Sequence, residues 1–307
     1  MKQRVLVTGG DGFVGRFLTA HLEAMGDEVV APSTDITDLA AFRKDVLDVE
    51  PSTVYHLAAL ASVGDSWNSS AETYRVNVLG TVNVLESVRA LTTPSRVLVV
   101  SSADVYGPSA MRDANGMPVD ETIPANPVSP YGGSKRAAEV AALQAHAGWG
   151  LPVVLARSFN HIGAAQSEGF VVSALAKQIA TAEISGSDRV LVGNLEAERD
   201  FLHVTDVVRA YRLLAERGRR GAIYNVASGD AVSISTVAQF MLSHATRPLE
   251  LVVDPERVRT VDVARIVGDA QTLRADTGWV PESNWQAGAV ACLDHWRTTI
   301  KATLPRP

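Results

Sequence analysis

Short runs of apolar, often β-branched residues alternate with amphipathic stretches over the first half of the chain. In the first amphipathic stretch, 13–25, Phe13, Phe17, Leu18 and Leu22 recur at helical spacing. The predicted strands are apolar throughout, and a predicted helix separates most of them from the next. This pattern favours a parallel sheet with helices on both faces. The predicted strands are 4–8, 28–31, 53–57, 96–101 and 153–157, and the remaining predicted helices are about 39–49, 71–91 and 128–147.

The pattern loosens from about His161. A helix is predicted near 170–183, a strand and a helix within 206–225, and a small mixed lobe over 232–307. The expected fold class is therefore α/β, a Rossmann-type doubly wound parallel sheet with a smaller mixed α/β lobe. We expect the first domain to comprise 1–160 plus about 201–228, and the second about 161–200 plus 229–307.

Composition excludes several classes of protein. The 307 residues carry a net charge of −6, and no run of Lys and Arg exceeds two residues, so a nucleic-acid partner is not expected. Apolar runs are too short to span a membrane, and no apolar leader follows Met1. The single Cys292 forms no internal disulfide, and no Cys/His cluster has metal-ligand spacing. We expect a soluble cytoplasmic protein with no metal and no membrane partner.

A glycine-rich segment, VTGGDGFVG, follows the first strand directly and opens the first helix. Its glycines are Gly9, Gly12 and Gly15. In such a turn one glycine tightens the bend, another admits a pyrophosphate to the backbone, and a third packs helix on strand. The amides of Phe13 and Val14 would then face the anion at the helix N-terminus. The alternative is a glycine-rich turn without a ligand, but the strand–turn–helix context favours a dinucleotide.

The end of the second strand bears on which dinucleotide binds. A carboxylate there would hold the adenosine ribose of NAD, but the chain instead runs Ala31-Pro32-Ser33. This favours NADP(H), with NAD(H) as the alternative, since no arginine obviously meets a 2′-phosphate. Asp35 follows two residues later, and it lies either near the adenine or at a helix N-terminus as a plain charge.

Tyr131 and Lys135 lie at i and i+4 of a predicted helix and hence on one face of it. A nearby ammonium would lower the pKa of the phenol and make it a better proton shuttle at neutral pH. Ser102, at the end of the strand LVVSS, is placed to hold a carbonyl oxygen beside it. Each residue alone has an ordinary structural explanation, but the three in this order after a phosphate loop predict a catalytic set.

These residues lie in motifs that resemble the extended short-chain dehydrogenase/reductases acting on nucleotide sugars. The resemblance implies that Ser102 binds the reacting oxygen, Tyr131 transfers the proton and Lys135 holds the nicotinamide ribose. It also implies that Asn77 either supports a proton-relay water or packs a helix. The similar segments are VTGGDGFVG, HLAALASV (56–63), RVNVLGT, SSADVYG, YGGSK, RSFNHIG and RDFLHVTD. Further implied cofactor contacts are Ile36, Leu57, Ala58 and Ala59.

Three later segments resemble GDP-4-keto-6-deoxy-mannose reductases: FNHIGAAQ, SEGFVVSALAKQI and VGNLEAERDF. The implied reaction is NAD(P)H-dependent reduction of the C4 ketone of GDP-4-dehydro-6-deoxy-D-mannose to GDP-6-deoxy-D-mannose. Alternatives are a GDP-mannose 4,6-dehydratase or a nucleotide-sugar 4-epimerase of the same fold. A non-enzymatic NADP sensor would be expected to lack the Ser/Tyr/Lys set. Ala164-Ala165 stands where these reductases carry Pro-Gly, so this loop is expected to follow a different path.

The resemblance also implies a GDP-sugar partner in the second lobe and a homodimer through helices near 71–91 and 128–147. Asp104 occupies the position of a dehydratase glutamate, one methylene shorter, and is expected to cap a turn or bond near the sugar. Lys177 is expected to be a solvated helix residue. The implied substrate contacts are Ser101, Ser102, Asn160, Val171, Arg199, Arg259 and Asp262.

Overall fold

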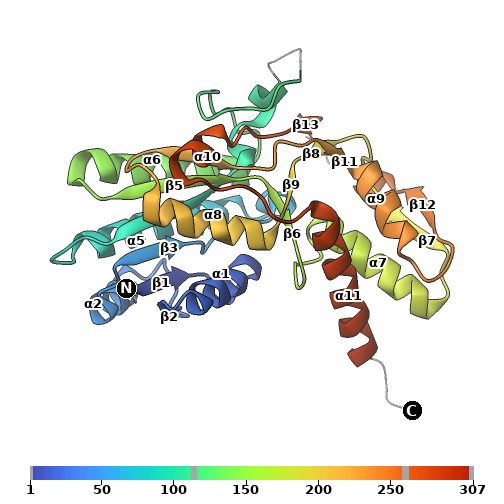
Figure 1. The fold of residues 1–307 in the computed structure, drawn as a ribbon, viewed down its shortest axis with the longest axis horizontal. Coiled ribbons are helices and arrows are strands. Elements are labelled where there is room, and N and C mark those ends of the chain that lie inside the picture. The colour runs from blue at the N-terminus through green and yellow to red at the C-terminus, as the bar shows by residue number, and fades with distance from the viewer. Residues whose placement is uncertain (1–2, 112–115, 258–262, 304–307) are drawn as a thin grey trace.

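The computed structural model describes residues 3–111, 116–257 and 263–303. At its centre lies one sheet of six parallel strands in the spatial order β10-β5-β4-β3-β1-β2 (Figure 1). The predicted doubly wound parallel sheet is confirmed. From β1 the chain passes to edge strand β2 and then back across β1 to β3, so the winding direction reverses there. The strands are β1 (Arg4–Thr8), β2 (Glu28–Val30), β3 (Thr53–His56), β4 (Arg96–Ser102), β5 (Val153–Ser158) and β10 (Ile223–Val226).

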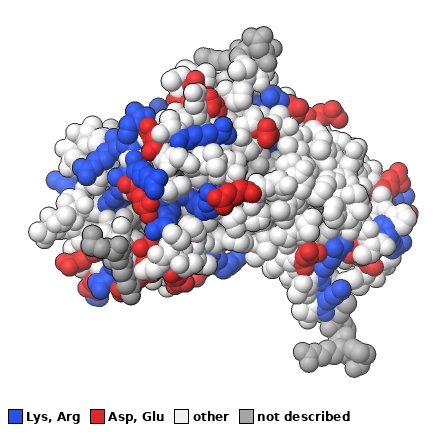
Figure 2. Space-filling model, viewed as in Figure 1, with Lys and Arg blue, Asp and Glu red and all other residues white. Residues whose placement is uncertain are grey.

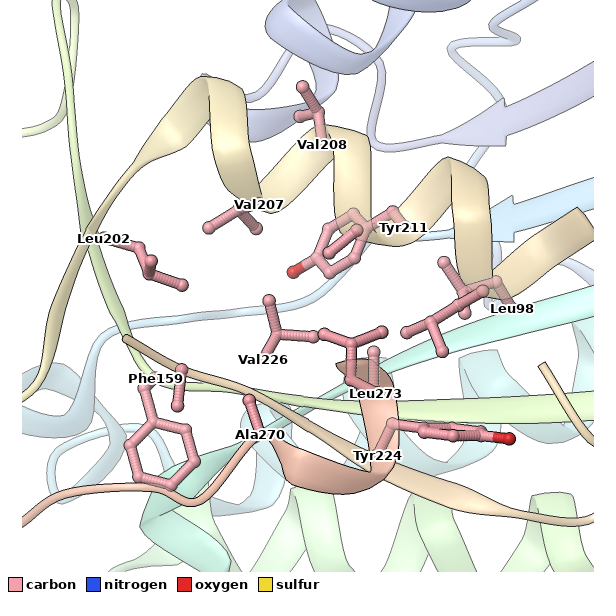
Figure 3. Packing of buried hydrophobic residues seen from close by; sticks show 14 of the residues in the cluster. Leu98, Phe159, Leu202, Val207, Val208, Tyr211, Tyr224, Val226, Ala270 and Leu273 are labelled. Carbon is pink, nitrogen blue, oxygen red and sulfur yellow. The ribbon is translucent and has the colours of Figure 1, made fainter. Parts of the chain in front are cut away.

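Alternate residues of the strands pack against helices on opposite faces of the sheet. Leu6 and Val97 belong to a buried cluster with residues of α2, α5 and α6. Val7 and Leu98 belong to the opposite cluster, with residues of α1 and α8. Figure 3 shows part of this second cluster, with Tyr211 of α8 facing the sheet. Helices on both faces explain why the middles of most strands are runs of consecutive apolar residues.

Most helices of this part of the chain lie where the sequence pattern predicted them. The segment predicted as one helix over 71–91 is instead three elements, because a π-helical turn, η1, interrupts it. The helical elements are α1 (Phe13–Ala24), α2 (Leu39–Val49), α3 (Val63–Ser66), α4 (Ser70–Tyr74), η1 (Arg75–Leu79), α5 (Gly80–Arg89), the 3₁₀ turns η2 (Ala103–Val105) and η3 (Gly107–Met111), α6 (Pro130–Trp149) and α8 (Val204–Arg217).

Helix α6 is long and has clear start and stop signals. The Ser129 side chain accepts a hydrogen bond from the Gly132 amide at 3.1 Å, and Pro130 occupies the first helical position. The helix ends where Gly150 takes a left-handed φ of 70°. The cap at Ser129 explains why the helix begins two residues after the predicted start.

The smaller lobe lies beside the carboxyl ends of the strands, and its hydrophobic core is formed mainly by α7, α9 and α11 (Figure 1). Its strands form three short sheets, β11-β8-β13, β12-β7 and β6-β9. The elements are β6 (Asn160–Ile162), α7 (Val171–Ser185), β7 (Arg189–Val192), β8 (Glu198–Arg199), β9 (Phe201–His203), β11 (Val232–Ser233), α9 (Ile234–Ser243), β12 (Glu250–Val253), η4 (Pro255–Arg257), β13 (Arg265–Ile266), α10 (Gln271–Thr277) and α11 (Trp285–Thr303).

The hydrophobic clusters refine where we propose to divide the chain. Ala270, Leu273 and Trp279 are buried in the cluster that packs α8 on the central sheet, as Figure 3 shows for Ala270 and Leu273. The division expected from the sequence assigned them to the second lobe. We therefore propose the two-lobe division with residues 266–279 joining the sheet domain.

Charge is mixed over the visible surface of the sheet domain, where Figure 2 shows Lys and Arg interspersed with Asp and Glu. This face has no broad basic patch of the kind that binds nucleic acid. Among the described residues, no helix is long and apolar enough to cross a membrane. The same residues contain no group of three or more potential metal ligands.

Candidate functional site

The glycine-rich loop forms a tight turn at the carboxyl end of β1. Gly9 has a φ of 70°, and a Cβ there would lie 2.9 Å from the Cα of Ala58. A Cβ on Gly15 would overlap the Gly9 carbonyl oxygen, so neither position accepts a side chain. Gly12, the N-cap of α1, is exposed and supplies no side-chain cap to the first helical amides. The cradle therefore fits a pyrophosphate, which would bond to those amides.

The residues Leu57–Ala59 leave β3 directly beside this loop and are half-buried. β1 and β3 are adjacent, and the winding direction of the sheet reverses between them. Ligands of open α/β sheets bind at such a switch point, at the carboxyl ends of the strands. Phe13 stacks on His161 with ring centroids 6.0 Å apart, so the start of α1 also contacts the second lobe at β6.

An acid from the segment after β2 and a base from η1 meet at Thr37. Asp35 is exposed, and its Oδ1 accepts from the amide and hydroxyl of Thr37, which hold the pKa of the carboxyl below its usual range. The guanidinium of Arg75 donates to the same Thr37 hydroxyl at 2.5 Å. Ser33 is exposed as expected. Ile36 instead buries its side chain in the core, so only its backbone is available to a ligand.

The proposed catalytic residues meet at the carboxyl end of β4. Tyr131 is buried, and the Ser102 hydroxyl lies close enough to its phenol to lower the pKa of the phenol. The Ser102 hydroxyl donates to Asp104 Oδ2 at 3.0 Å and accepts from the Asp104 amide at 3.1 Å, which caps η2. The carboxylate of Asp104 therefore orients Ser102, in keeping with the turn role expected for it.

The pKa of Tyr131 corrects one expectation from the sequence. Burial raises it above its ordinary value, and the negative charge of Asp104 raises it further, while the nearby Ser102 hydroxyl opposes both. Lys135 does not lower the pKa as expected, because its amine donates to the Val100 carbonyl at 2.9 Å. The phenol is therefore protonated at neutral pH.

One helical turn beyond Lys135 lies a buried ion pair that the sequence pattern did not predict. Glu139, one turn further along α6, is fully buried and accepts from Arg157 of β5 at 2.8 and 2.9 Å. Burial lowers the pKa of Lys135 to about 8, and the charge of Glu139 acts in the opposite sense. Spacing could have revealed Glu139, which follows Lys135 by the same four residues that separate Lys135 from Tyr131.

Ser101 belongs to this support. Its hydroxyl donates to Glu139 Oε1 at 2.7 Å, whereas its neighbour Ser102 faces Tyr131. This placement differs from the substrate contact expected for Ser101.

Asn77 lies in the π-helical turn η1 and is buried. Its side chain exchanges hydrogen bonds with the backbone of Leu60 at 2.8 and 3.1 Å, and donates to Ser134 Oγ at 2.9 Å. Of its two proposed roles, these contacts support helix packing.

The proposed substrate residues that the structure describes here lie in β6, at the start of α7 and in β8. Asn160 is exposed, with its amide 3.4 Å from the Asp200 carbonyl, and Val171 is exposed at the start of α7. Arg199, half-buried in β8, donates to the Glu198 carbonyl at 2.8 Å. Arg259 and Asp262 lie outside the described residues.

A cavity of about 590 Å³ opens between α7 and β7. Polar and charged side chains dominate its lining, among them Glu168, Lys177, Arg189 and Arg257. Lys177 is not simply solvated, because it pairs with Glu168 at 2.5 Å and lies 5.2 Å from the Trp296 ring centre. The cavity mouth thus offers both cations and a carboxylate.

Ala165 adopts a φ of 64°, the left-handed conformation that suits glycine. The next residue, Gln166, is fixed at both ends: its side-chain amide donates to the His161 carbonyl at 2.8 Å, and its own carbonyl accepts from Ser173 at 2.6 Å. These bonds hold the loop in a conformation suited to glycine although Ala165 carries a Cβ. The different path expected for this loop is therefore not seen at Ala165.

Comparison with known proteins places this geometry in a family. The model of the GDP-mannose 4,6 dehydratase family matches residues 32–290. The chain belongs to this family. It is 36% identical to the GDP-6-deoxy-D-mannose reductase of Pseudomonas aeruginosa, over 98% of this chain and 99% of that protein. It is also 29% identical to a UDP-glucose 4-epimerase of Streptomyces lividans, over 96% of both proteins.

Solved structures of family relatives share the fold. The structure of RMD from Pseudomonas aeruginosa complexed with NADPH matches with a TM-score of 0.89 and 34% identity, over 97% of this chain and all of that one. A Thermus thermophilus UDP-glucose 4-epimerase in complex with NAD matches with a TM-score of 0.85 and 29% identity, over 96% and 99% of the two chains. Proteins of this fold are thus recorded with either nicotinamide dinucleotide.

The conformation of Ala165 leads to a stability prediction. Ala165→Gly should stabilise the protein by about 1 kcal/mol. The free energy gained by relieving the left-handed strain is larger than the free energy lost because glycine makes the unfolded chain more flexible. Urea unfolding measures the change. Ala164→Gly is the control, since Ala164 has no positive φ and the substitution should destabilise. A lower stability for Ala165→Gly would contradict the assigned conformation.

Proposed function

We propose that this protein reduces the C4 ketone of GDP-4-dehydro-6-deoxy-D-mannose to GDP-6-deoxy-D-mannose with NADPH. The observation that carries the proposal is the buried, protonated Tyr131 close to Ser102, together with the glycine-rich cradle. The 36% identity with a GDP-6-deoxy-D-mannose reductase over nearly the whole chain supports this substrate. The presence of Ser102, Tyr131 and Lys135 together argues against a purely NADP-sensing regulator.

The residues present fit a nicotinamide dinucleotide, which supplies a hydride when it is bound in its reduced form. We assign the pyrophosphate to the amides at the start of α1, with Gly9, Gly12 and Gly15 providing close approach. Leu57–Ala59 would line the cofactor beside β3. Ser33, Asp35 and the nearby Arg75 would meet the adenosine end. A hydroxyl and a guanidinium without a ribose-binding carboxylate on β2 favour the 2′-phosphate of NADPH, with NADH as a second cofactor.

The protein residues would divide the remaining chemistry. When the sugar binds, the Ser102 hydroxyl would turn its one hydrogen from Asp104 to the ketone oxygen and hold the carbonyl in place. Tyr131 would give its phenolic proton to the oxygen as negative charge develops there, and its raised pKa keeps that proton available. Lys135 would hold the nicotinamide ribose with its ammonium. Asp104 would fix the orientation of Ser102.

The second lobe would bind the nucleotide diphosphate. Guanidinium groups pair well with phosphates, which supports Arg199 for this role. Asn160 and Val171 would contact the sugar or the diphosphate at the lobe boundary. The expected roles of Arg259 for the diphosphate and Asp262 for the ribose remain part of the proposal. The charged cavity between α7 and β7 is large enough for part of a nucleotide.

The alternative activity within the family is GDP-mannose 4,6-dehydration, which also requires proton abstraction from C5. We propose that Asp104 performs no such step, because its carboxylate accepts the Ser102 hydroxyl and its side chain is one methylene shorter than the glutamate expected in dehydratases.

We also propose that two copies associate through α5 and α6. Leu79, Val140 and Trp149 expose 48%, 42% and 42% of their surface on these helices and the adjoining η1 turn, although all three are large and apolar. Light scattering should report a dimer, and Val140→Asp should shift it towards monomer. A monomeric wild-type protein would refute the dimer.

The cytoplasm remains the proposed location, as expected from the absence of an internal disulfide.

The reaction itself can be tested with two incubations. GDP-4-dehydro-6-deoxy-D-mannose with NADPH should oxidise one cofactor per ketone, more efficiently than with NADH, whereas GDP-mannose with NADP⁺ should yield no ketone. Tyr131→Phe should bind NADPH normally and turn over at least about 10²-fold more slowly, the loss typical of a missing general acid. Dehydration of GDP-mannose would instead establish the alternative, and near-normal turnover by Tyr131→Phe would remove that residue from its role.

The pKa of Lys135 predicts the pH dependence. Burial lowers it to about 8, so the ammonium is present below this pH and is lost above it. Since Lys135 is proposed to act as a cation, kcat/KM should fall above about pH 8, approaching tenfold per pH unit. Tyr131 retains its proton in this range and should add no second alkaline step. A profile that stays flat to about pH 10 would show that the ammonium is not required.

A further inference from the structure

A chain of buried hydrogen bonds starts at Thr8, the last residue of β1. Its hydroxyl oxygen accepts from the amides of Leu57 and Ala58 at 3.2 and 3.1 Å. The same oxygen lies 2.8 Å from Nδ1 of His56. Thr8 therefore joins the ends of β1 and β3. These strands lead into the glycine-rich loop and into Leu57–Ala59, the two segments of the proposed dinucleotide cradle.

The hydrogen bonds around His56 determine its tautomer. Nε2 of the imidazole lies 2.9 Å from the hydroxyl oxygen of Thr81, and this hydroxyl donates its hydrogen to the Asn77 carbonyl at 2.6 Å. Since Thr81 has no second hydrogen to give, it must accept from the imidazole, and the proton is on Nε2. Nδ1 is then free to accept from Thr8, whose oxygen already receives two amides.

The chain continues through Asn77 into the helix that carries the proposed catalytic residues. The Asn77 side-chain amide donates to Ser134 Oγ at 2.9 Å, and the Ser134 hydroxyl donates to the Tyr131 carbonyl at 2.7 Å. From Thr8 to the Asn77 carbonyl every hydrogen bond thus runs in the same donor-to-acceptor direction, and the Asn77 side-chain amide starts a second run that ends at the Tyr131 carbonyl. Neighbouring bonds of such a chain polarise and strengthen one another.

The members of this chain have no alternative partner in water. Thr8, His56, Asn77, Thr81 and Ser134 are all buried. Burial lowers the pKa of His56 to about 3, and the nearby positive charge of Lys135 contributes. The imidazole is therefore neutral at physiological pH, so both nitrogens keep their separate roles of donor and acceptor.

We propose that His56 is a positioning residue which, in its neutral Nε2-protonated form, ties the dinucleotide cradle to the helix bearing Tyr131 and Lys135. The proposal rests on the proposed function for the identity of the ligand in the cradle, but not for the tautomer. It explains why a histidine, with a donor and an acceptor on opposite sides of a rigid ring, stands between two threonines. Thr81 acts through His56 in the same way.

The tautomer can be measured without a ligand or an activity. Nitrogen NMR of the ¹⁵N-histidine-labelled protein, with the signal assigned by its loss in His56→Gln, should show Nε2 protonated and Nδ1 bare. Neither nitrogen should change between about pH 5 and pH 8, where an unperturbed histidine titrates. A proton on Nδ1, or titration inside this window, would overturn the proposal.

The link to the cradle is tested by removing one hydroxyl. Thr81→Val keeps the shape of the side chain but leaves His56 Nε2 without an acceptor, so it should weaken NADPH binding by about tenfold or more and slow turnover. Thr81→Ser restores the hydroxyl and should bind NADPH as the wild type does. Fluorescence titration of NADPH gives the dissociation constants, independently of which sugar is the substrate.

A matched control lies on the same helix. The Ser87 hydroxyl donates to the Asn83 carbonyl at 2.7 Å, the same bond to the preceding turn that Thr81 makes, but without a histidine. Ser87→Ala should leave NADPH affinity unchanged. Equal affinity for Thr81→Val and the wild type, or equal losses in Thr81→Val and Ser87→Ala, would overturn the role in positioning. If Thr81→Val does not fold, the tautomer measurement on the wild-type protein still tests the proposal.

Discussion

The buried ion pair between Glu139 of α6 and Arg157 of β5 fixes the helix on which the proposed chemistry depends. Two charges removed from water carry a large desolvation cost, which close and well-aligned hydrogen bonds between them offset. Both carboxylate oxygens of Glu139 are used, by Arg157, by Ser101 and by Arg136. Loss of Glu139 would leave the buried guanidinium of Arg157 without its carboxylate, at a cost of about 3–5 kcal/mol.

The ion pair fixes where the side chains on the two preceding turns of α6 lie. Tyr131, Lys135 and Glu139 follow one another at intervals of four residues along one buried face of α6. With Glu139 anchored to β5, Lys135 reaches the Val100 carbonyl of β4 and Tyr131 reaches Ser102 at the end of the same strand. The phenol and the amine thus receive separate partners, so the amine does not act on the phenol and the two groups are free for different tasks.

Sequence patterns predicted most of the fold because it depends on features that act locally. Apolar strands, helical spacing and glycines that leave no room for a Cβ are visible in single segments. The π-helical turn at 75–79 was not predicted, and within it Asn77 bonds to Leu60, a contact that the local sequence pattern does not reveal. The predicted direction of the Tyr131 pKa shift was wrong for a similar reason. Spacing of four residues puts Lys135 on the same face but does not show where its amine points.

The central claim is that hydride passes to C4 of the sugar while Tyr131 protonates the oxygen on that carbon. The most direct measurement uses NADPH with both C4 hydrogens of the nicotinamide replaced by deuterium, together with GDP-4-dehydro-6-deoxy-D-mannose, and NMR of the product sugar. The account predicts one deuterium bound to C4 of a 6-deoxy sugar. Recovery of unreacted ketone, or a reduced sugar with no deuterium at C4, would contradict it.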